Sequence, residues 1–206
     1  MKKTTAFSFL FALALTGCAN ELYPSLYYYM KEKKLPPVTE ENFPHCEGYG
    51  CPIYKNVMLN KRDWKIIEKA YGKKARNAAE EREKAAQAIG AFERVVGPIT
   101  GTDVDVAGTF GKTGKGQLDC VDESTNTTIY LMLLKQKGLL NFHEIEQPQV
   151  RWPIISGRGW MHQTAAVTEK TTGSQYAIDS WFDDNGAAAR VIPLEDWRNG
   201  WHPEED

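Results

Sequence analysis

The sequence has 206 residues, of which 25 are Lys or Arg and 27 are Asp or Glu, for a formal net charge of −2 at pH 7. This balance excludes the strongly basic surface that a nucleic-acid-binding protein needs, so no nucleic-acid partner is expected. The length is sufficient for one domain with a hydrophobic core.

The N-terminal segment 1–18 has the pattern of an export signal. Lys2 and Lys3 form a positive region, and residues 6–15 form an apolar run that is too short to span a bilayer. Residues 15–18, Leu-Thr-Gly-Cys, resemble the lipobox of bacterial lipoproteins, in which the cysteine is acylated. On that resemblance Cys18 is a membrane anchor, and since no Asp follows it, we expect the outer membrane facing the periplasm. An ordinary soluble export signal is the alternative.

Residues 19–40 are rich in Tyr, Lys and Pro, and we expect them to be a tether that leads to a domain covering residues 41–206. Within that domain, Cys46 and Cys51 follow a histidine. Two cysteines and one histidine fall short of a four-ligand zinc site, and an exported protein meets an oxidising compartment. We therefore expect a short-loop disulfide and no metal, which leaves Cys120 as the candidate nucleophile.

Residues 61–96 carry a long helical pattern that is broken near Gly72 and ends at the Gly-Pro pair at 97–98. The apolar residues that recur three, four or seven positions apart are Trp64, Ile67, Tyr71, Ala75, Ala78, Ala85, Ile89, Phe92 and Val96. This segment is predicted to form a helical layer.

Arg82 falls on the same apolar stripe. Its guanidinium either extends to water from the edge of the stripe or pairs with an acidic residue such as Asp122 or Glu123, because an unpaired buried charge is costly. Such a pair would offset the tendency of these carboxylates to raise the pKa of a nearby thiol.

Residues 99–115 form a polar, glycine-containing loop that leads to Cys120. Asp119 is a good N-cap, Asp122 approximates a capping box, and Gly138 fits the glycine that ends a helix. Cys120 then lies in the first turn, where unpaired N–H groups and the helix dipole favour an anion. A helix N-terminus or an imidazolium lowers the pKa of a cysteine from about 8.5 to roughly 3.5–7.5, so we expect a thiolate if a histidine is within reach.

Two short strands, 162–168 and 175–181, flank a polar turn and predict a β-hairpin. A turn centred near residues 170–171 places His162 opposite Asp179, and directly opposed residues point to the same face. We therefore expect the carboxylate to contact the imidazole and to hold its tautomer. A slip of one residue would place the two side chains on opposite faces.

Cys120 at the start of a helix, His162 on a strand and Asp179 on the next strand resemble the core of the transglutaminase-like cysteine proteinases in the papain-like superfamily. The resemblance covers residues 116–197. It implies an α+β fold in which the cysteine-bearing helix packs on a small antiparallel sheet, and the helices over residues 61–96 are the layer that precedes this core. The cysteine-flanking sequence of animal transglutaminases has no close match here, and no calcium loop is found.

This resemblance implies acyl transfer on an amide or ester without a cofactor. Cys120 would attack the carbonyl, His162 would move the proton, and Asp179 would orient His162. The backbone N–H of Cys120 is one candidate oxyanion donor, and the second is Gln117 or the indole of Trp160. Water as acceptor gives hydrolysis and an amine gives cross-linking. The expected substrate is a peptide, a protein or a cell-wall peptide.

Other interpretations stay open. His143 is the alternative catalytic histidine, whereas His45 and His202 are interpreted as peripheral. The protein could instead be a binding module at the cell envelope that keeps the fold without turnover. A papain-like cell-wall endopeptidase is a further enzyme class, but those enzymes usually carry Asp-Cys-Ser and this chain has Asp-Cys-Val.

Overall fold

The computed structural model describes residues 24–110, 114–152 and 161–203, so the predicted anchor Cys18 and the oxyanion candidate Trp160 lie outside the described residues. The helices are α1 (Pro24–Glu32), α2 (Lys61–Tyr71), α3 (Ala78–Thr100), α4 (Cys120–Gln136) and α6 (Leu194–Arg198). The strands are β1 (Phe43–Glu47), β2 (Ile53–Val57), β3 (His143–Ile145), β4 (Gln149–Arg151), β5 (His162–Glu169), β6 (Gln175–Asp179) and β7 (Arg190–Pro193). None of the helices in these ranges is long and apolar enough to cross a membrane.

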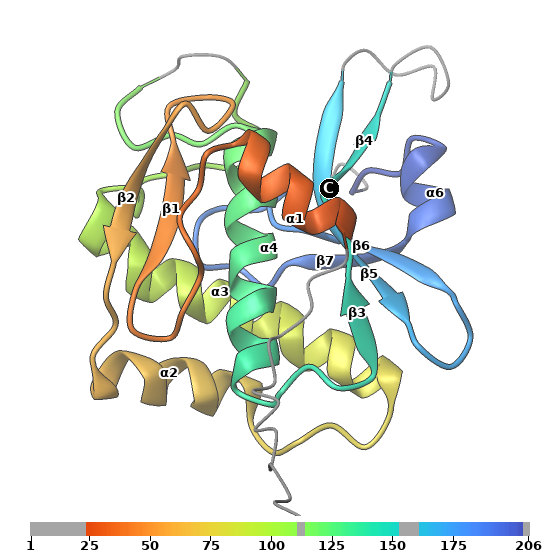
Figure 1. The fold of residues 1–206 in the computed structure, drawn as a ribbon. Coiled ribbons are helices and arrows are strands. Elements are labelled where there is room, and N and C mark those ends of the chain that lie inside the picture. The colour runs from red at the N-terminus through yellow and green to blue at the C-terminus, as the bar shows by residue number, and fades with distance from the viewer. Residues whose placement is uncertain (1–23, 111–113, 153–160, 204–206) are drawn as a thin grey trace, which may run out of the picture.

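The larger sheet is antiparallel with the order β3-β5-β6-β7, and β4 pairs with the first part of β5. Strands β1 and β2 form a separate hairpin. Figure 1 shows α4 between that hairpin and the larger sheet, with α3 crossing beside it. The predicted α+β class is therefore confirmed.

Helix α4 is buried on every side, because all residues from Cys120 to Leu134 are buried. Both of its predicted ends are confirmed. Asp119 caps the N-terminus in a capping box with Asp122, and Gly138 adopts a left-handed φ of 68° in a Schellman motif. A helix without a free face must find partners for its polar side chains inside the protein.

The predicted break near Gly72 is confirmed, because α2 ends there with a positive φ of 75°. Phe92 of α3 stacks on Tyr130 of α4 with 4.6 Å between ring centroids. Helix α3 continues past Pro98, so the predicted end at the Gly-Pro pair is wrong. A proline in the last turn removes only one backbone hydrogen bond, and the left-handed residue that ends the helix is Gly101, with a φ of 80°.

The predicted tether is wrong for residues 24–40, which pack against the domain. Helix α1 buries Leu26 and Met30 in the main core. The hydroxyl of its Tyr29 lies 2.6 Å from Oγ1 of Thr125 in α4. Tyr- and Lys-rich composition suggested a linker, but apolar residues four apart bury one face even of a short helix.

Candidate active site

Strands β5 and β6 bring His162 and Asp179 together. Nε2 of the histidine lies 2.8 Å from Oδ2 of the aspartate, and both side chains are buried. The predicted register is wrong by two residues, because Ala165 pairs with Ile178 and Asp179 therefore lies opposite Thr164. A shift of two residues keeps a side chain on the same face of a sheet. The predicted contact between the histidine and the aspartate is thus confirmed.

Three donors hold the carboxylate of Asp179. Besides the bond to His162, Nε1 of Trp197 donates to Oδ2 at 2.8 Å and the backbone N–H of Trp181 donates to Oδ1 at 3.3 Å. A carboxylate only accepts hydrogen bonds, so Nε2 of His162 carries a proton. Its other ring nitrogen, Nδ1, is buried and has no hydrogen-bond partner among the described residues. The Nδ1 lone pair is therefore available to a proton.

Cys120 lies beside this pair at the start of α4 and is 5% exposed. It belongs to a buried cluster with Val121 and Trp181, and Phe182 packs against this cluster. Both rings also contact the His162 ring, with centroid distances of 4.6 and 5.1 Å. The backbone N–H of Gln163, the residue after His162, is close enough to the thiol to lower its pKa. The three predicted residues are thus gathered at one site.

The thiol of Cys120 does not have the predicted low pKa. Burial raises its pKa to about 12, and the negative charges of Asp119 and Asp179 act in the same direction, against backbone hydrogen bonds that lower it. Asp119 accepts the N–H groups of Val121 and Asp122 at 3.0 and 2.8 Å. The cap thus places a carboxylate where the helix terminus would otherwise stabilise a thiolate. The thiol is neutral until a base takes its proton.

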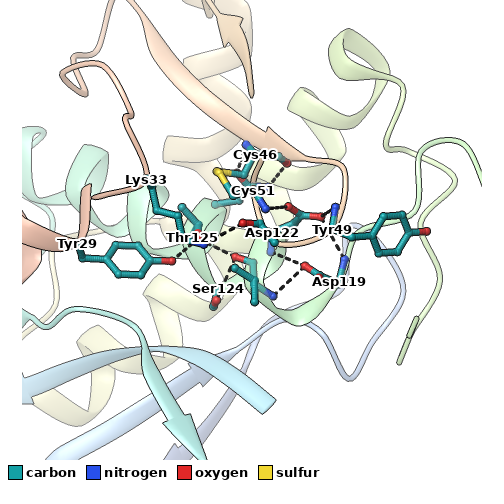
Figure 2. Close-up of a disulfide and its surroundings, with 12 residues drawn as sticks. Tyr29, Lys33, Cys46, Tyr49, Cys51, Asp119, Asp122, Ser124 and Thr125 are labelled. Atoms are coloured by element: carbon teal, nitrogen blue, oxygen red, sulfur yellow. Dashed lines mark hydrogen bonds between the residues drawn. A yellow bond between two sulfur atoms is a disulfide. The ribbon is translucent and has the colours of Figure 1, made fainter. Parts of the chain in front are cut away.

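The disulfide loop is attached to the same turn of α4 (Figure 2). Cys46 and Cys51 form the predicted disulfide. The backbone N–H groups of Tyr49 and Cys51 donate to Asp122 at 2.8 and 2.7 Å. One turn later, Asn126 accepts from the N–H of Cys46 at 2.6 Å and donates to its carbonyl at 3.0 Å. The β1–β2 hairpin therefore holds the end of α4 that carries the thiol.

Gln117 is not placed as an oxyanion donor, so that prediction is wrong. Its Nε2 donates to the carbonyl of Val104 at 2.6 Å, and its Oε1 accepts from the hydroxyl of Thr109 at 3.0 Å. These bonds hold the loop before α4, and Nε1 of Trp181 donates to the carbonyl of Thr109 at 3.1 Å. Trp181 therefore connects this loop to the site. Among the described residues, the backbone N–H of Cys120 remains the candidate oxyanion donor.

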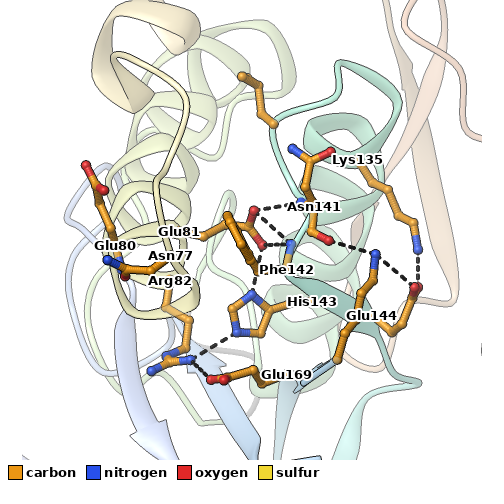
Figure 3. Close-up of polar contacts among 12 residues, drawn as sticks. Asn77, Glu80, Glu81, Arg82, Lys135, Asn141, Phe142, His143, Glu144 and Glu169 are labelled. Atoms are coloured by element: carbon orange, nitrogen blue, oxygen red, sulfur yellow. Dashed lines mark hydrogen bonds and ion pairs between the residues drawn. The ribbon is translucent and has the colours of Figure 1, made fainter. Parts of the chain in front are cut away.

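The alternative histidine, His143, belongs to a separate buried network (Figure 3). Its Nδ1 lies 2.8 Å from Oε1 of Glu81, and its Nε2 lies 3.1 Å from Nη1 of Arg82. Arg82 pairs with an acidic residue, which was one of the two alternatives, but its partner is Glu169 at 2.8 Å and not Asp122 or Glu123. Because both ring nitrogens of His143 are engaged and neither partner is a nucleophile, this network holds the fold together.

His45 is not peripheral, contrary to the sequence interpretation. It is buried, with Nδ1 at 3.1 Å from the hydroxyl of Tyr130 and Nε2 at 3.3 Å from Oγ1 of Thr102. Burial lowers the pKa of His45 to about 3, so the ring is neutral. Within the described ranges, no group of three or more His, Cys, Asp or Glu residues could hold a metal ion.

A group of buried carboxyls extends from α3 to the start of α4. Burial raises the pKa of Glu93 to about 8, and it also raises the pKa values of Asp105 and Glu123. Glu123 accepts the hydroxyl of Ser180 at 2.6 Å, and Glu93 accepts the N–H of Gly186 at 2.8 Å. The second oxygen of Glu93 has no partner in the part of the chain that the structure describes.

Trp181 and Trp197 belong to the site, although neither was predicted from the sequence. The available signal was their chemistry, because a buried indole N–H needs an acceptor and a buried carboxylate needs donors.

A pocket of about 790 Å³ bordered by β4, β6 and α6 includes Arg151 but none of the three predicted catalytic residues.

Comparisons with protein-family models, with curated proteins and with solved structures find no match to this chain.

Proposed function

We propose that the protein is a cysteine-dependent acyl-transfer enzyme with a transglutaminase-like core, acting on an amide of a peptide, a protein or a cell-wall peptide. One observation carries the proposal: His162 is bonded to Asp179 through Nε2 and has a free Nδ1, beside the one free cysteine of the described chain. A carboxylate on one nitrogen and a lone pair on the other are what a general base requires.

The reaction follows from the neutral state of Cys120. Nδ1 of His162 accepts the thiol proton as Sγ attacks the carbonyl carbon, and Asp179 stabilises the imidazolium that forms. The imidazolium then gives its proton to the leaving amine, and a thioester on Cys120 remains. Water or a second amine attacks this thioester and regenerates the thiol, which completes hydrolysis or transamidation.

The test is acylation by an activated nitrophenyl ester, followed as nitrophenolate release and as acyl groups mapped to peptides by mass spectrometry. We expect a label on Cys120, no label at this position in Cys120→Ala, and rates lower by roughly 10²–10⁴-fold in His162→Gln and Asp179→Asn. His143→Gln is the matched control and should acylate normally if it folds. Equal rates in the wild type, His162→Gln and Asp179→Asn would refute the triad.

The second candidate is an envelope binding module without turnover. The burial of Cys120 and the rise of its pKa to about 12 favour this alternative. The same experiment separates the two, because a binding module would show no acylation that depends on His162. Its ligand binding would also survive Cys120→Ser.

We also propose that Cys18 anchors the protein to a membrane at the cell envelope. Five residues lie between Cys18 and Pro24 at the start of α1, and a chain of that length spans at most about 20 Å. Helix α1 exposes Tyr27 and Tyr28, together with Lys31, a combination suited to lipid head groups. Cys18→Ala should move the protein from the membrane fraction to the soluble fraction, and unchanged membrane association would contradict the anchor.

A further inference from the structure

We propose that Trp197 is a positioning residue for the acyl-transfer site, and that its indole N–H fixes the carboxylate of Asp179 for its work on His162. This inference rests on the proposed function and adds a fourth side chain to the three predicted from the sequence. Trp197 comes from α6, near the C-terminal end of the described chain.

The contact geometry is specific. Nε1 of Trp197 and Nε2 of His162 approach the same oxygen of Asp179, Oδ2, each at 2.8 Å. Trp197 has no solvent exposure, and its ring lies 5.6 Å from the imidazole ring. Two donors on one buried oxygen determine both the rotation of the carboxylate and the direction in which it faces the imidazole.

Arg151 holds α6 in place for this contact. Its Nη1 donates to the backbone carbonyls of Trp197 at 2.5 Å and Trp201 at 2.8 Å, and its guanidinium lies 4.8 Å from the Trp197 ring. Arg151 is also paired with His162 across the β4–β5 ladder. One residue therefore joins the strand that carries the histidine, through its backbone, to the helix that carries the tryptophan, through its side chain.

Removing the indole N–H has two consequences with different signatures. A carboxylate with one donor fewer is a stronger base, so it stabilises the imidazolium of His162 more and moves the acid limb of the pH–rate profile upward. A carboxylate that is free to rotate also holds the imidazole less well, so the rate of acylation falls without a change in substrate binding. A role confined to packing would alter stability and leave the pH profile in place.

The experiment compares Trp197→Phe with the wild type by nitrophenyl ester acylation across the pH range. The loss of one hydrogen bond to a charged group predicts a maximal rate lower by roughly 10- to 100-fold with unchanged KM, and an acid limb moved upward by about one pH unit. Trp64→Phe is the matched control, since Trp64 is a buried tryptophan of α2 that packs on Phe92 away from the site, and the substitution should leave both quantities unchanged. A Trp197→Phe protein with the wild-type rate or the wild-type acid limb would overturn the proposal.

Nuclear magnetic resonance of the imidazole gives a second readout that needs no turnover. The imidazole N–H signal of His162 should shift in Trp197→Phe, and the indole N–H signal of Trp197 should shift when Asp179 is replaced by Asn. An unmoved indole signal would overturn the proposal even if Trp197→Phe does not fold. A wild type that is not acylated at Cys120 would instead count against the proposed function, while the two resonance measurements still report on the contact.

Discussion

Replacing Glu93 by Gln should make the protein more stable at alkaline pH. Glu93 is buried beside Glu123 and Asp105, and burial raises its pKa to about 8, whereas an ordinary glutamate titrates near 4.5. At about 1.4 kcal/mol per pH unit, this difference in pKa corresponds to roughly 5 kcal/mol of unfolding free energy.

The sign follows from which state binds the proton more tightly. The folded pKa lies above the unfolded one, so this stability is fully present below about pH 4.5 and is lost as the pH rises through about 8. Above that range a charged carboxylate is buried near two other acids. Glutamine keeps an oxygen that can accept the N–H of Gly186 and has no proton to lose.

The assay is urea denaturation followed by tryptophan fluorescence at about pH 4 and about pH 9, which bracket the window set by linkage. The wild type should lose unfolding free energy between these values, and Glu93→Gln should lose several kcal/mol less. Glu83→Gln, an exposed position on the same helix, is the matched control and should follow the wild type. An equal pH dependence in Glu93→Gln and the wild type would refute the reasoning.

Three further outcomes are expected. Replacing Cys46 and Cys51 by Ser should lower the unfolding free energy by about 2 kcal/mol, because the disulfide closes a short loop and so restricts the entropy of the unfolded chain only modestly. An unchanged urea midpoint would contradict this. Arg82→Leu should cost roughly 1–3 kcal/mol in thermal melts through its lost bonds to Glu169 and His143, yet leave acylation unchanged, whereas a loss of acylation in folded protein would argue against a structural role. Iodoacetamide should modify Cys120 on the order of a thousandfold more slowly in folded than in urea-unfolded protein near neutral pH, because burial raises its pKa to about 12, and equal rates would rule out that pKa.

Local signals predicted the features that depend on a few neighbouring residues. The capping box of Asp119, the closing glycine Gly138 and the disulfide between Cys46 and Cys51 were all readable from spacing and residue type. Each of these features satisfies backbone groups or closes a chain within a few positions, so the sequence nearby carries most of the information.

Features that depend on distant partners were not predictable in the same way. The β5–β6 register differs by two residues because the turn places the left-handed residue at Gly173, whose N–H bonds back to the carbonyl of Glu169. Gln117 precedes the cysteine as expected, but its bond to Val104 keeps its amide away from an oxyanion role. Cys120 begins its helix as expected, but burial by the rest of the fold raises its pKa.

The complete burial of α4 has a consequence for how the chain assembles. Its polar side chains depend on different segments: Asp122 on the disulfide loop, Thr125 on α1, Ser124 on β5 and Thr127 on the segment after β6. When one neighbour packs on α4 before the others, it removes water from polar groups whose partners are still missing, at a cost of about 1–3 kcal/mol each, so a partly assembled intermediate gains little from the contacts it has made. Folding should therefore be all-or-none, and the thiol reaches its histidine only in the finished molecule.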